Sequence, residues 1–278
     1  MIRPVKPPRR PSLDVLKVFD LTGRAAVVTG GGSGIGRATA QVLAGAGAGV
    51  VVGDIVEAGA KETVRLIEEA GGRAVPHLVD VTQKAQVDEL VDRAVQEYGR
   101  LDAMANVAGV AADGSIADTT EEFLDRSFAI NLKGVLFGCQ AAVRVMQGQE
   151  TGGSIVNVSS TAIDAPARNY GVYAMAKAAV AQLTKTLALE VGRHNIRVNT
   201  IAPGMTITPF TSRHLYEPDG TLNQEKYDAF VEQMKKLSPL KRVGEPEDQA
   251  YLILYLVSDA ARFSTGTIWR ANGGQAML

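Results

Sequence analysis

The sequence has very little cysteine and histidine. Cys139 is the only cysteine in 278 residues, so no disulfide can form within the chain. Its neighbours, GVLFGCQAAV, indicate a small core residue on a buried helix face. The three histidines, His77, His194 and His214, have no spacing that would bring two of them onto one helical turn. This composition fits a reducing compartment, and we expect a cytoplasmic protein without a metal site.

Net charge is nearly absent too, at -1, and no long run of like charge occurs. Such a chain has no broad field to attract nucleic acid or an anionic membrane. No stretch reaches the ~18 to 20 uninterrupted apolar residues that cross a bilayer. Residues 1–20 are basic and proline-rich but lack the continuous apolar core of a secretory signal. We expect no nucleic acid and no membrane as partners, and we expect residues 1–20 to form an arm, with an oligomer contact as the alternative.

What the sequence does contain is a regular alternation of strand and helix patterns from residue 21 onward. AAVVTG precedes the helical pattern GRATAQVLAGAG, and VVVGD precedes EAGAKETVRLIEEAG. Apolar runs such as residues 50–52 lack alternation, as expected of strands that are buried on both faces. The pattern predicts an α/β fold: a single doubly wound Rossmann-type domain over residues 21–278, with a parallel sheet and helices on both faces. Residues 205–242 are the least regular and are expected to form a lid over the substrate.

Glycines follow the first predicted strand in VVTGGGSGIGRA. Gly30, Gly34 and Gly36 lie between this strand and the first helix, where the backbone can turn sharply and approach a pyrophosphate at the helix N-terminus. The spacing is T-G-x-x-x-G-x-G rather than G-x-G-x-x-G. A glycine-rich turn can also be purely structural, so the loop alone is a weak signal.

Asp54 closes the second predicted strand, and its carboxylate points to NAD. A carboxylate there accepts hydrogen bonds from the adenosine ribose and repels the extra phosphate of NADP. Ser33, in the glycine loop, offers no positive charge to that phosphate. The alternative is that Asp54 only caps the following helix.

The chain resembles the short-chain dehydrogenase/reductase family over residues 21–278. The resemblance rests on TGGGSGIG, DV at 80–81, NVAG at 106–109, SS at 159–160, YAMAK at 173–177 and PGMTIT at 203–208, in the family's order. Three positions depart from its pattern, namely Val107, Ile163 and Asn272. The first should affect packing beneath the cofactor, and the other two concern substrate shape and the C-terminal contacts.

The resemblance implies two sets of site residues. The catalytic set is Asn131, Ser160, Tyr173 and Lys177. We expect the cofactor to be bound by Gly30, Ser33, Gly34, Ile35, Gly36, Asp54, Asp80, Val81, Asn106, Ala108, Gly109, Tyr173, Lys177, Pro203, Gly204, Thr206 and Thr208.

The catalytic set suits the interconversion of a secondary alcohol and a ketone, in which a hydride moves at the nicotinamide and a proton at the oxygen. Tyr173 and Lys177 are four residues apart and share a helix face. The lysine cation is expected to lower the pKa of the phenol from about 10 toward the working pH. By resemblance, Ser160 positions the substrate oxygen and Asn131 belongs to a relay through water to the lysine. A local hydrogen bond is the alternative role of Asn131.

Several aromatic residues are candidates for the substrate pocket. Tyr170 has Ala174 rather than a lysine four residues on, so we expect it in the pocket wall or at the surface. Phe210, His214 and Tyr216 in the lid could line the pocket or simply pack within a mobile segment.

The sequence therefore predicts an NAD-dependent oxidoreductase acting on a small or medium-sized alcohol or ketone. One alternative is an NADPH-dependent carbonyl or oxoacyl-thioester reductase, and another is a catalytically silent nucleotide-binding protein on the same fold. The resemblance also implies a homotetramer in which helices at residues 132–147 and 170–192 pair between subunits. The small face formed by Ala174, Ala178 and Ala181 permits this close approach, but it could equally pack on its own sheet.

Overall fold

The computed structural model describes residues 15–217, 219 and 221–277. Most of the expected N-terminal arm, residues 1–14, lies outside the described residues. The described chain begins with a short 3₁₀ turn, η1 (Lys17–Phe19).

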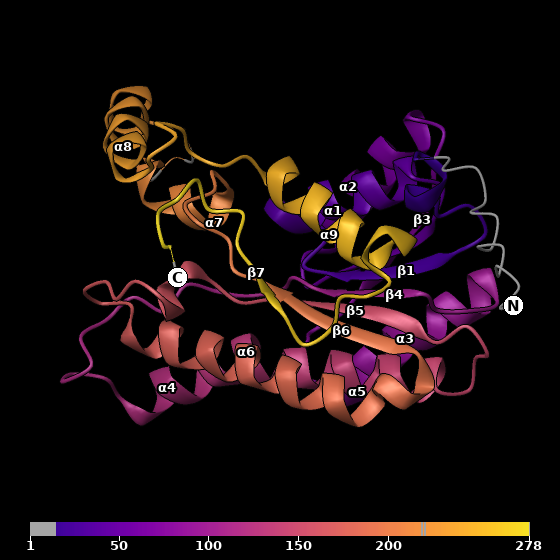
Figure 1. Cartoon of the computed structure of the whole chain (residues 1–278). Coiled ribbons are helices and arrows are strands. Elements are labelled where there is room, and N and C mark those ends of the chain that lie inside the picture. The colour runs from indigo at the N-terminus through magenta and orange to yellow at the C-terminus, as the bar shows by residue number, and fades with distance from the viewer. Residues whose placement is uncertain (1–14, 218, 220, 278) are drawn as a thin grey trace, which may run out of the picture.

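A parallel seven-stranded sheet forms the centre of the molecule (Figure 1). Its strand order is β3-β2-β1-β4-β5-β6-β7, and every neighbouring pair is parallel. The strands are β1 (Ala25–Thr29), β2 (Gly49–Asp54), β3 (Arg73–Leu78), β4 (Ala103–Asn106), β5 (Gly153–Val158), β6 (Ile196–Ile201) and β7 (Ile268–Trp269). This architecture confirms the predicted doubly wound fold.

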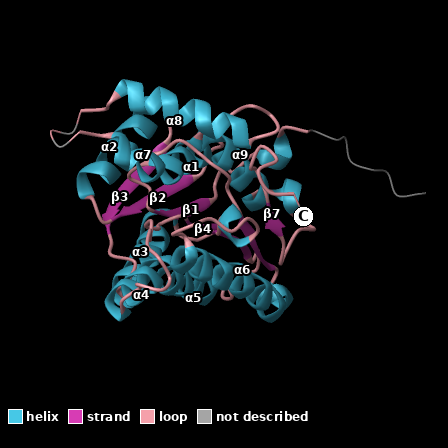
Figure 2. Ribbon diagram, turned by 90° about the vertical axis from the view of Figure 1, so that its left-hand side faces the viewer, coloured by secondary structure: helices cyan, strands magenta, loops and turns pink. Residues whose placement is uncertain are grey.

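Helices cover both faces of the sheet (Figures 1 and 2). One face carries α1 (Gly34–Gly45), α2 (Glu57–Glu69) and α9 (Pro246–Val257). The other carries α3 (Lys84–Tyr98), α5 (Gly134–Met146) and α6 (Gly171–Val191). The remaining elements are α4 (Glu121–Phe128), the π-helical turn η2 (Ala129–Lys133), α7 (Pro209–Ser212), α8 (Gln224–Leu237) and the 3₁₀ turns η3 (Thr161–Ile163), η4 (Gly192–His194), η5 (Arg213–Leu215) and η6 (Asp259–Ala261).

The unbroken apolar runs in the sequence are explained by this double cover. Val27 and Val28 are consecutive and both fully buried, but they belong to core clusters on opposite faces of the sheet. Successive side chains of a strand point to opposite sides, so a strand buried on both faces needs an apolar residue at every position.

By length and composition, one helical run among the described residues could cross a bilayer, namely Glu121–Met146. Its α5 portion packs on the sheet through Val135, Cys139 and Met146, each at most 2% exposed. A core helix passes the same test, so this run gives little support for a membrane span.

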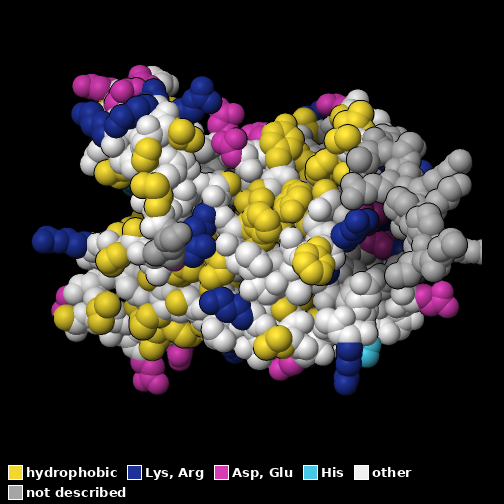
Figure 3. Space-filling model, in the orientation of Figure 1, with side chains coloured by type: hydrophobic (Ala, Val, Ile, Leu, Met, Phe, Trp, Pro, Cys, Tyr) yellow, Lys and Arg dark blue, Asp and Glu magenta, His cyan; other side chains and the backbone are white. Residues whose placement is uncertain are grey.

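The region expected to be a lid forms a separate layer beside the sheet. It contains α7, η5 and α8, and α8 is amphipathic. Charged side chains crowd the outer face of α8, with apolar side chains beneath them (Figure 3). The following helix, α9, begins at Pro246 as predicted, and Glu245 and Asp248 form a capping box there.

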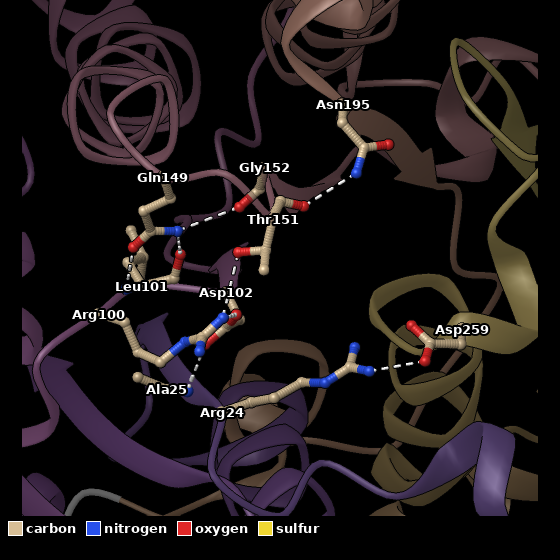
Figure 4. A network of polar contacts seen from close by, with 10 residues as sticks. All are labelled: Arg24, Ala25, Arg100, Leu101, Asp102, Gln149, Thr151, Gly152, Asn195 and Asp259. Carbon is tan, nitrogen blue, oxygen red and sulfur yellow. Dashed lines mark hydrogen bonds and ion pairs between the residues drawn. The ribbon is translucent and has the colours of Figure 1, made fainter.

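Polar side chains tie the loops together at the amino ends of the strands (Figure 4). Asp102 accepts hydrogen bonds from the backbone N–H of Ala25 (2.9 Å) and from Arg100 Nε (2.7 Å). Gln149 bonds both to the N–H and to the C=O of Leu101, at 2.8 Å each. These bonds satisfy backbone groups that the ends of the strands would otherwise leave unpaired.

The order of the strands reverses between β1 and β4, and the chain opens a crevice at their carboxyl ends. Thr29, the last residue of β1, holds the end of β4 by accepting hydrogen bonds from the N–H groups of Val107 (3.1 Å) and Ala108 (3.2 Å). In doubly wound sheets such a reversal is where ligands bind.

Candidate active site

A cavity of about 800 Å³ opens at this crevice. Its walls come from the glycine loop after β1, from the carboxyl ends of β2, β4, β5 and β6, and from the lid. Asp54 and Asp80 lie in the part near β2 and β3, and Tyr173 and Phe210 lie in the wall formed by α6 and the lid. The cavity therefore connects the predicted cofactor loop with the predicted catalytic residues.

The glycine loop needs residues without side chains at two positions. Gly30 has φ +66°, and a Cβ there would stand 2.8 Å from the Cα of Ala108. At Gly36 a Cβ would stand only 1.9 Å from the carbonyl oxygen of Gly30. The loop therefore lies close against the N-terminus of α1, where free N–H groups and the helix dipole favour an anion. This geometry fits a pyrophosphate.

Side chains from three elements brace this loop. Thr63 of α2 donates to the carbonyl of Gly31 at 2.8 Å, and Arg37 of α1 donates to the carbonyl of Gly32. Asp54 accepts from the N–H of Gly32 at 2.8 Å. Sequence reasoning missed Thr63, which lies on α2 and carries no local signal, and Arg37, whose position directly after the last glycine could have indicated a role.

Asp54 does not cap α2, whose N-cap is Val56 without a side-chain cap bond, but it bonds to nearby backbone and reaches the cavity. Its Oδ1 accepts from the N–H of Val56 at 2.8 Å, and its Oδ2 binds Gly32. Its side chain also lines the cavity. The helix-cap alternative is therefore wrong, whereas a cofactor role stays a prediction, because a carboxylate that accepts two bonds can accept more.

Most of the residues expected to bind the cofactor lie around the cavity. The lining residues among them are Gly30, Ser33, Gly34, Ile35, Gly36, Asp54, Asp80, Val81, Ala108, Gly109, Tyr173, Lys177, Pro203, Gly204, Thr206 and Thr208. Gly34 and Thr208 face each other closely, since a Cβ on Gly34 would lie 3.1 Å from the Thr208 side chain.

Asn106 is the one residue of the expected cofactor set that does not line the cavity. Its side chain is 2% exposed and turns away from the cavity, toward α5. Nδ2 donates to Asn157 Oδ1 at 2.9 Å, and the side chain packs so closely on Gly138 that a Cβ there would lie 1.9 Å from Asn106 Oδ1. The amide of Asn106 thus joins β4 to β5 and α5, and its part in cofactor binding stays a prediction.

Tyr173 and Lys177 lie on one face of α6 and are almost fully buried, at 9% and 2% exposure. Lys177 Nζ stands 5.6 Å from the centre of the Tyr173 ring and donates to the carbonyl of Val158 at 2.9 Å. Ser160 follows β5, and its Oγ accepts from the N–H of Ala162 at 3.1 Å. Ser159 instead donates to the carbonyl of Lys177, which anchors β5 to α6.

The expected low pKa of the phenol is not found. Burial raises the pKa of Tyr173 to about 12, although a hydrogen bond with Ser160 opposes this rise. Burial also lowers the pKa of Lys177 to about 8. Both shifts have the same physical cause, because loss of water disfavours the charged form of each group.

Asn131 lies in the π-helical turn η2, between α4 and α5, and is fully buried. Its Oδ1 accepts from the N–H of Val110 and its Nδ2 donates to the carbonyl of the same residue, at 3.0 Å each. These two bonds join Asn131 to a residue 21 positions away, and the local bond is a separate one, from Nδ2 to Ser127 Oγ at 3.3 Å. A Cβ on Gly109 would lie 2.9 Å from Asn131 Oδ1 and 3.4 Å from Lys177 Nζ. Asn131 Oδ1 and Lys177 Nζ thus both lie beside Gly109, although Asn131 does not line the cavity itself.

Aromatic and aliphatic side chains form the wall around Tyr173. The ring centres of Tyr170 and Phe210 lie 6.2 and 5.9 Å from that of Tyr173. Both residues line the cavity. In contrast, His214 packs on Phe230 with ring centres 5.2 Å apart, and Tyr216 is 45% exposed. Neither of these last two lid residues lines the cavity.

The inner face of α8 completes this wall. Phe230, Met234 and Leu237 line the cavity. Sequence reasoning missed them, although their spacing of four and three residues places them on one helix face. Their amphipathic pattern could have identified them.

Metal ligands do not gather in this region. Within residues 15–217, 219 and 221–277, no three His, Cys, Asp or Glu side chains are placed to hold a metal ion. The absence of a metal stays a prediction.

Comparisons with known proteins agree with this geometry. A family model described as Enoyl-(Acyl carrier protein) reductase matches residues 30–276. The chain is 38% identical over 262 residues to the short chain dehydrogenase/reductase astE of Aspergillus oryzae, a match that covers 94% of the chain and 97% of the relative.

Solved structures of the same fold cover nearly the whole chain. A short-chain type dehydrogenase/reductase from Mycobacterium marinum superposes with a TM-score of 0.86 at 33% identity, over 95% of this chain and 100% of that one. A 7α-hydroxysteroid dehydrogenase complexed with NADH and 7-oxo-glycochenodeoxycholic acid gives a TM-score of 0.83 at 31% identity, over 94% and 97%. The chain therefore belongs to the short-chain dehydrogenase/reductase family, whose members are oxidoreductases that use a nicotinamide cofactor.

Proposed function

We propose that the protein is an NAD-dependent dehydrogenase that interconverts a secondary alcohol and a ketone on an apolar, small or medium-sized substrate. The observation that supports this most is a single cavity lined both by the glycine loop at α1 and by Ser160 and Tyr173. A cofactor bound along the loop and a substrate bound at Tyr173 would share that space.

Different residues of this chain would bind the cofactor, hold the substrate and transfer the proton. The bound nicotinamide supplies the hydride chemistry. The loop N–H groups and the N-terminus of α1 would hold the pyrophosphate, and Thr208 would contact the nicotinamide end. Ser160 would hold the substrate oxygen by a hydrogen bond, and Tyr173 would exchange a proton with it.

The raised pKa of Tyr173 decides which form of the phenol is present at neutral pH. With a pKa of about 12, the phenol keeps its proton at neutral pH and is ready to donate it to a ketone oxygen during reduction. Oxidation needs the phenolate, so its rate should rise with pH. Lys177, whose Nζ lies 5.6 Å from the centre of the ring, would help a proton leave the phenol as long as it keeps its own charge, and would exchange protons toward Asn131.

Asp54 supports NAD as the cofactor. Its carboxylate lines the cavity directly beside the glycine loop, where the 2′-phosphate of NADP would meet a like charge. The family model's description as an acyl-carrier-protein reductase favours the second candidate, an NADPH-dependent reductase of thioester-bound substrates. The two candidates differ in which reduced cofactor binds more tightly.

Fluorescence titration with NADH and NADPH tests this proposal. We expect tighter binding of NADH and a loss of the preference by about tenfold or more in Asp54→Asn, because a hydrogen bond to a charged group is worth about 1.5 to 3 kcal/mol. Asp54→Asn retains a side-chain oxygen for Gly32, whereas Asp54→Ala also frees the loop. Tighter binding of NADPH by the unchanged protein would reject the NAD proposal in favour of the second candidate.

The substrate class follows from the wall around Tyr173. Tyr170, Phe210, Phe230 and Met234 present apolar surface to the cavity. Apolar walls with few polar groups are typical of sites for apolar ligands. We propose a ring-bearing or aliphatic alcohol or ketone, which a spectrophotometric screen at the absorbance of NADH would identify.

We further propose a cytoplasmic homotetramer that pairs through α5 and α6. The outer face of α6 exposes Leu189 (87%) and Met175 (46%), which are large apolar side chains. Ala178 is exposed on the same helix, whereas Ala181 is buried against the molecule's own core. The mass measured by light scattering tests this assembly.

A further inference from the structure

The C-terminal segment, residues 270–275, lies between three walls of the cavity. It leaves the edge strand β7 and runs between the lid helices and the body of the domain (Figure 1, yellow). The resemblance singled out only Asn272 in it, as a departure from the family pattern. Its contacts reach the loop after β5, the turn after β6 and the end of α8.

The first contact joins the segment to the loop after β5, residues 161–170. Arg270 donates to both carboxylate oxygens of Asp164, from Nε at 2.7 Å and from Nη2 at 3.1 Å. The Asp164 side chain is 6% exposed and that of Arg270 is 24% exposed. A bidentate pair with so little exposure holds its geometry more firmly than a surface ion pair does. This loop carries Tyr170 and leads into Tyr173.

The second contact joins the segment to the turn after β6, residues 203–208. Gln275 Oε1 accepts from the N–H of Met205 at 2.7 Å, and Gln275 lines the cavity. The turn lies so close that a Cβ on Gly204 would stand 2.6 Å from Gln275 Oε1 and 2.8 Å from the Cα of Asn272. Gln275 thus lies directly on the turn that we expect to hold the nicotinamide.

The third contact joins the segment to the end of the lid. Ser238, which follows α8 and is fully buried, donates from Oγ to the carbonyl of Gly273 at 2.9 Å. Gly273 has no room for a side chain, because a Cβ there would stand 2.5 Å from Ser238 Oγ. The last turn of α8 carries Met234 and Leu237, which line the cavity.

Between these contacts the segment is held as a compact turn. Asn272 accepts from the N–H of Gly274 at 2.9 Å and donates from Nδ2 to the carbonyl of Ala276 at 2.8 Å. An aspartate at this position has no amide to donate the second bond. Gln249 of α9 donates to the carbonyl of Ala271 at 2.8 Å, so the helix layer also anchors the segment.

We propose that residues 270–275 are a positioning element that couples the substrate loop, the nicotinamide turn and the lid, so that the three walls of the cavity order together. The substrate loop is held by Arg270, the nicotinamide turn by Gln275 and the end of the lid by Gly273. Because the compact turn connects these three contacts, the loss of one of them should increase the mobility of the other two walls. That the coupling serves cofactor and substrate binding rests on the proposed function. The joint ordering of the three walls follows from the fold alone.

Hydrogen exchange of the full chain, measured by mass spectrometry, tests the coupling in Arg270→Ala. We expect exchange to speed up by about tenfold or more at residues 161–170, because losing a bond to a buried charge shifts local opening by that factor. The coupling predicts faster exchange at 203–208 and 228–240 as well. Asp164→Ala should give the same pattern, and the double variant should add little to either change.

Arg24→Ala is the matched control for this experiment. It removes an arginine–aspartate pair of 2.7 Å with Asp259 at the opposite end of the sheet, and it should leave all three regions unchanged. An effect of Arg270→Ala that stays within residues 161–170 would overturn the proposal, since the contact would then be only local. Should Arg270→Ala fail to fold, Arg270→Lys keeps the charge but loses the bidentate geometry and answers the same question.

Gln275 allows a second test with NADH as the probe. Gln275→Leu frees the N–H of Met205 and should weaken NADH binding about tenfold, whereas Gln275→Glu retains an acceptor and should recover most of the affinity. Equal affinities in the two variants would contradict the role of Gln275. A chain that binds no NADH at all would reject the proposed function, and the exchange experiment would still decide the coupling.

Discussion

At the amino ends of the strands, Asp102, Gln149 and Asn195 direct their hydrogen bonds to the protein's own backbone or to neighbouring side chains. At the carboxyl ends, Ser160 and Tyr173 also bond to the protein, but both side chains line an open cavity as well. The two ends are built from the same parallel strands. The difference arises because the helices that follow strands begin at the carboxyl ends, which leaves their N–H groups and the glycine loop exposed to a ligand.

Buried polar side chains alone therefore do not identify a functional site. The amino end closes its network on itself and contributes stability, whereas the carboxyl end leaves polar groups available at some cost in stability. Changes at the amino end should therefore alter the free energy of unfolding, and changes at the carboxyl end should alter turnover.

The largest effect is expected for Tyr173→Phe. Removing the phenolic oxygen should lower kcat by about 10² to 10⁴, since that is the usual contribution of a positioned acid or base. The melting temperature and NADH affinity should change little, because the ring still packs beside Phe210. Steady-state kinetics with a ketone from the screen measures the loss, and Tyr170→Phe is the control that should retain activity. Near-normal turnover of Tyr173→Phe would contradict the role of Tyr173 in proton transfer, and with it the functional difference between the two ends of the sheet.

At the amino end, Asp102→Ala should lower the free energy of unfolding by about 2 to 3 kcal/mol, because it leaves the N–H of Ala25 and the Arg100 cation without their partner. Urea denaturation measures this change, while kcat/KM should stay within about twofold. Asp259→Ala at the same end removes the exposed pair with Arg24 and should cost less than about 1 kcal/mol. A marked fall in kcat/KM for Asp102→Ala would show that the two ends are not independent.

The smallest effect is a pH dependence that comes from Lys177. Its folded pKa of about 8 lies below its ordinary value of 10.5, so the unfolded chain binds more protons between these two values. Stability should therefore rise with pH in that window, by about 2 kcal/mol between pH 8 and pH 9.5. Tyr173 has the opposite sign, since its raised pKa makes stability fall between pH 10 and about 12.

Urea denaturation at several pH values, compared with Lys177→Met, isolates the contribution of the lysine. The variant should lose the rise between pH 8 and pH 9.5, because no group at position 177 then titrates. An equal rise of the free energy of unfolding in both proteins would mean that Lys177 does not cause the pH dependence. The carboxyl end would then lack the lowered lysine pKa that distinguishes it from the amino end.

Most of the candidate site could be predicted from the sequence because its signals are local. Tyr173 and Lys177 share one helix face by their spacing, and Gly30 and Gly36 mark a loop that no side chain fits. Asn106 shows the limit of this reasoning. It matches the family motif, yet its amide faces Asn157 and α5, because the direction of a side chain at the end of a strand depends on what packs beneath it.

The sequence by itself determined the layers, the strand and helix pattern and the cofactor loop of this protein, because hydrophobic period and glycine spacing act over a few residues. Only the tertiary structure decided which walls enclose the cavity. Arg270 meets Asp164 across 106 positions of the chain, and burial raises the pKa of Tyr173 where the spacing alone indicated a fall. Both results depend on segments that are far apart in the chain, which place the ion pair and exclude water from the phenol, and no local pattern records this.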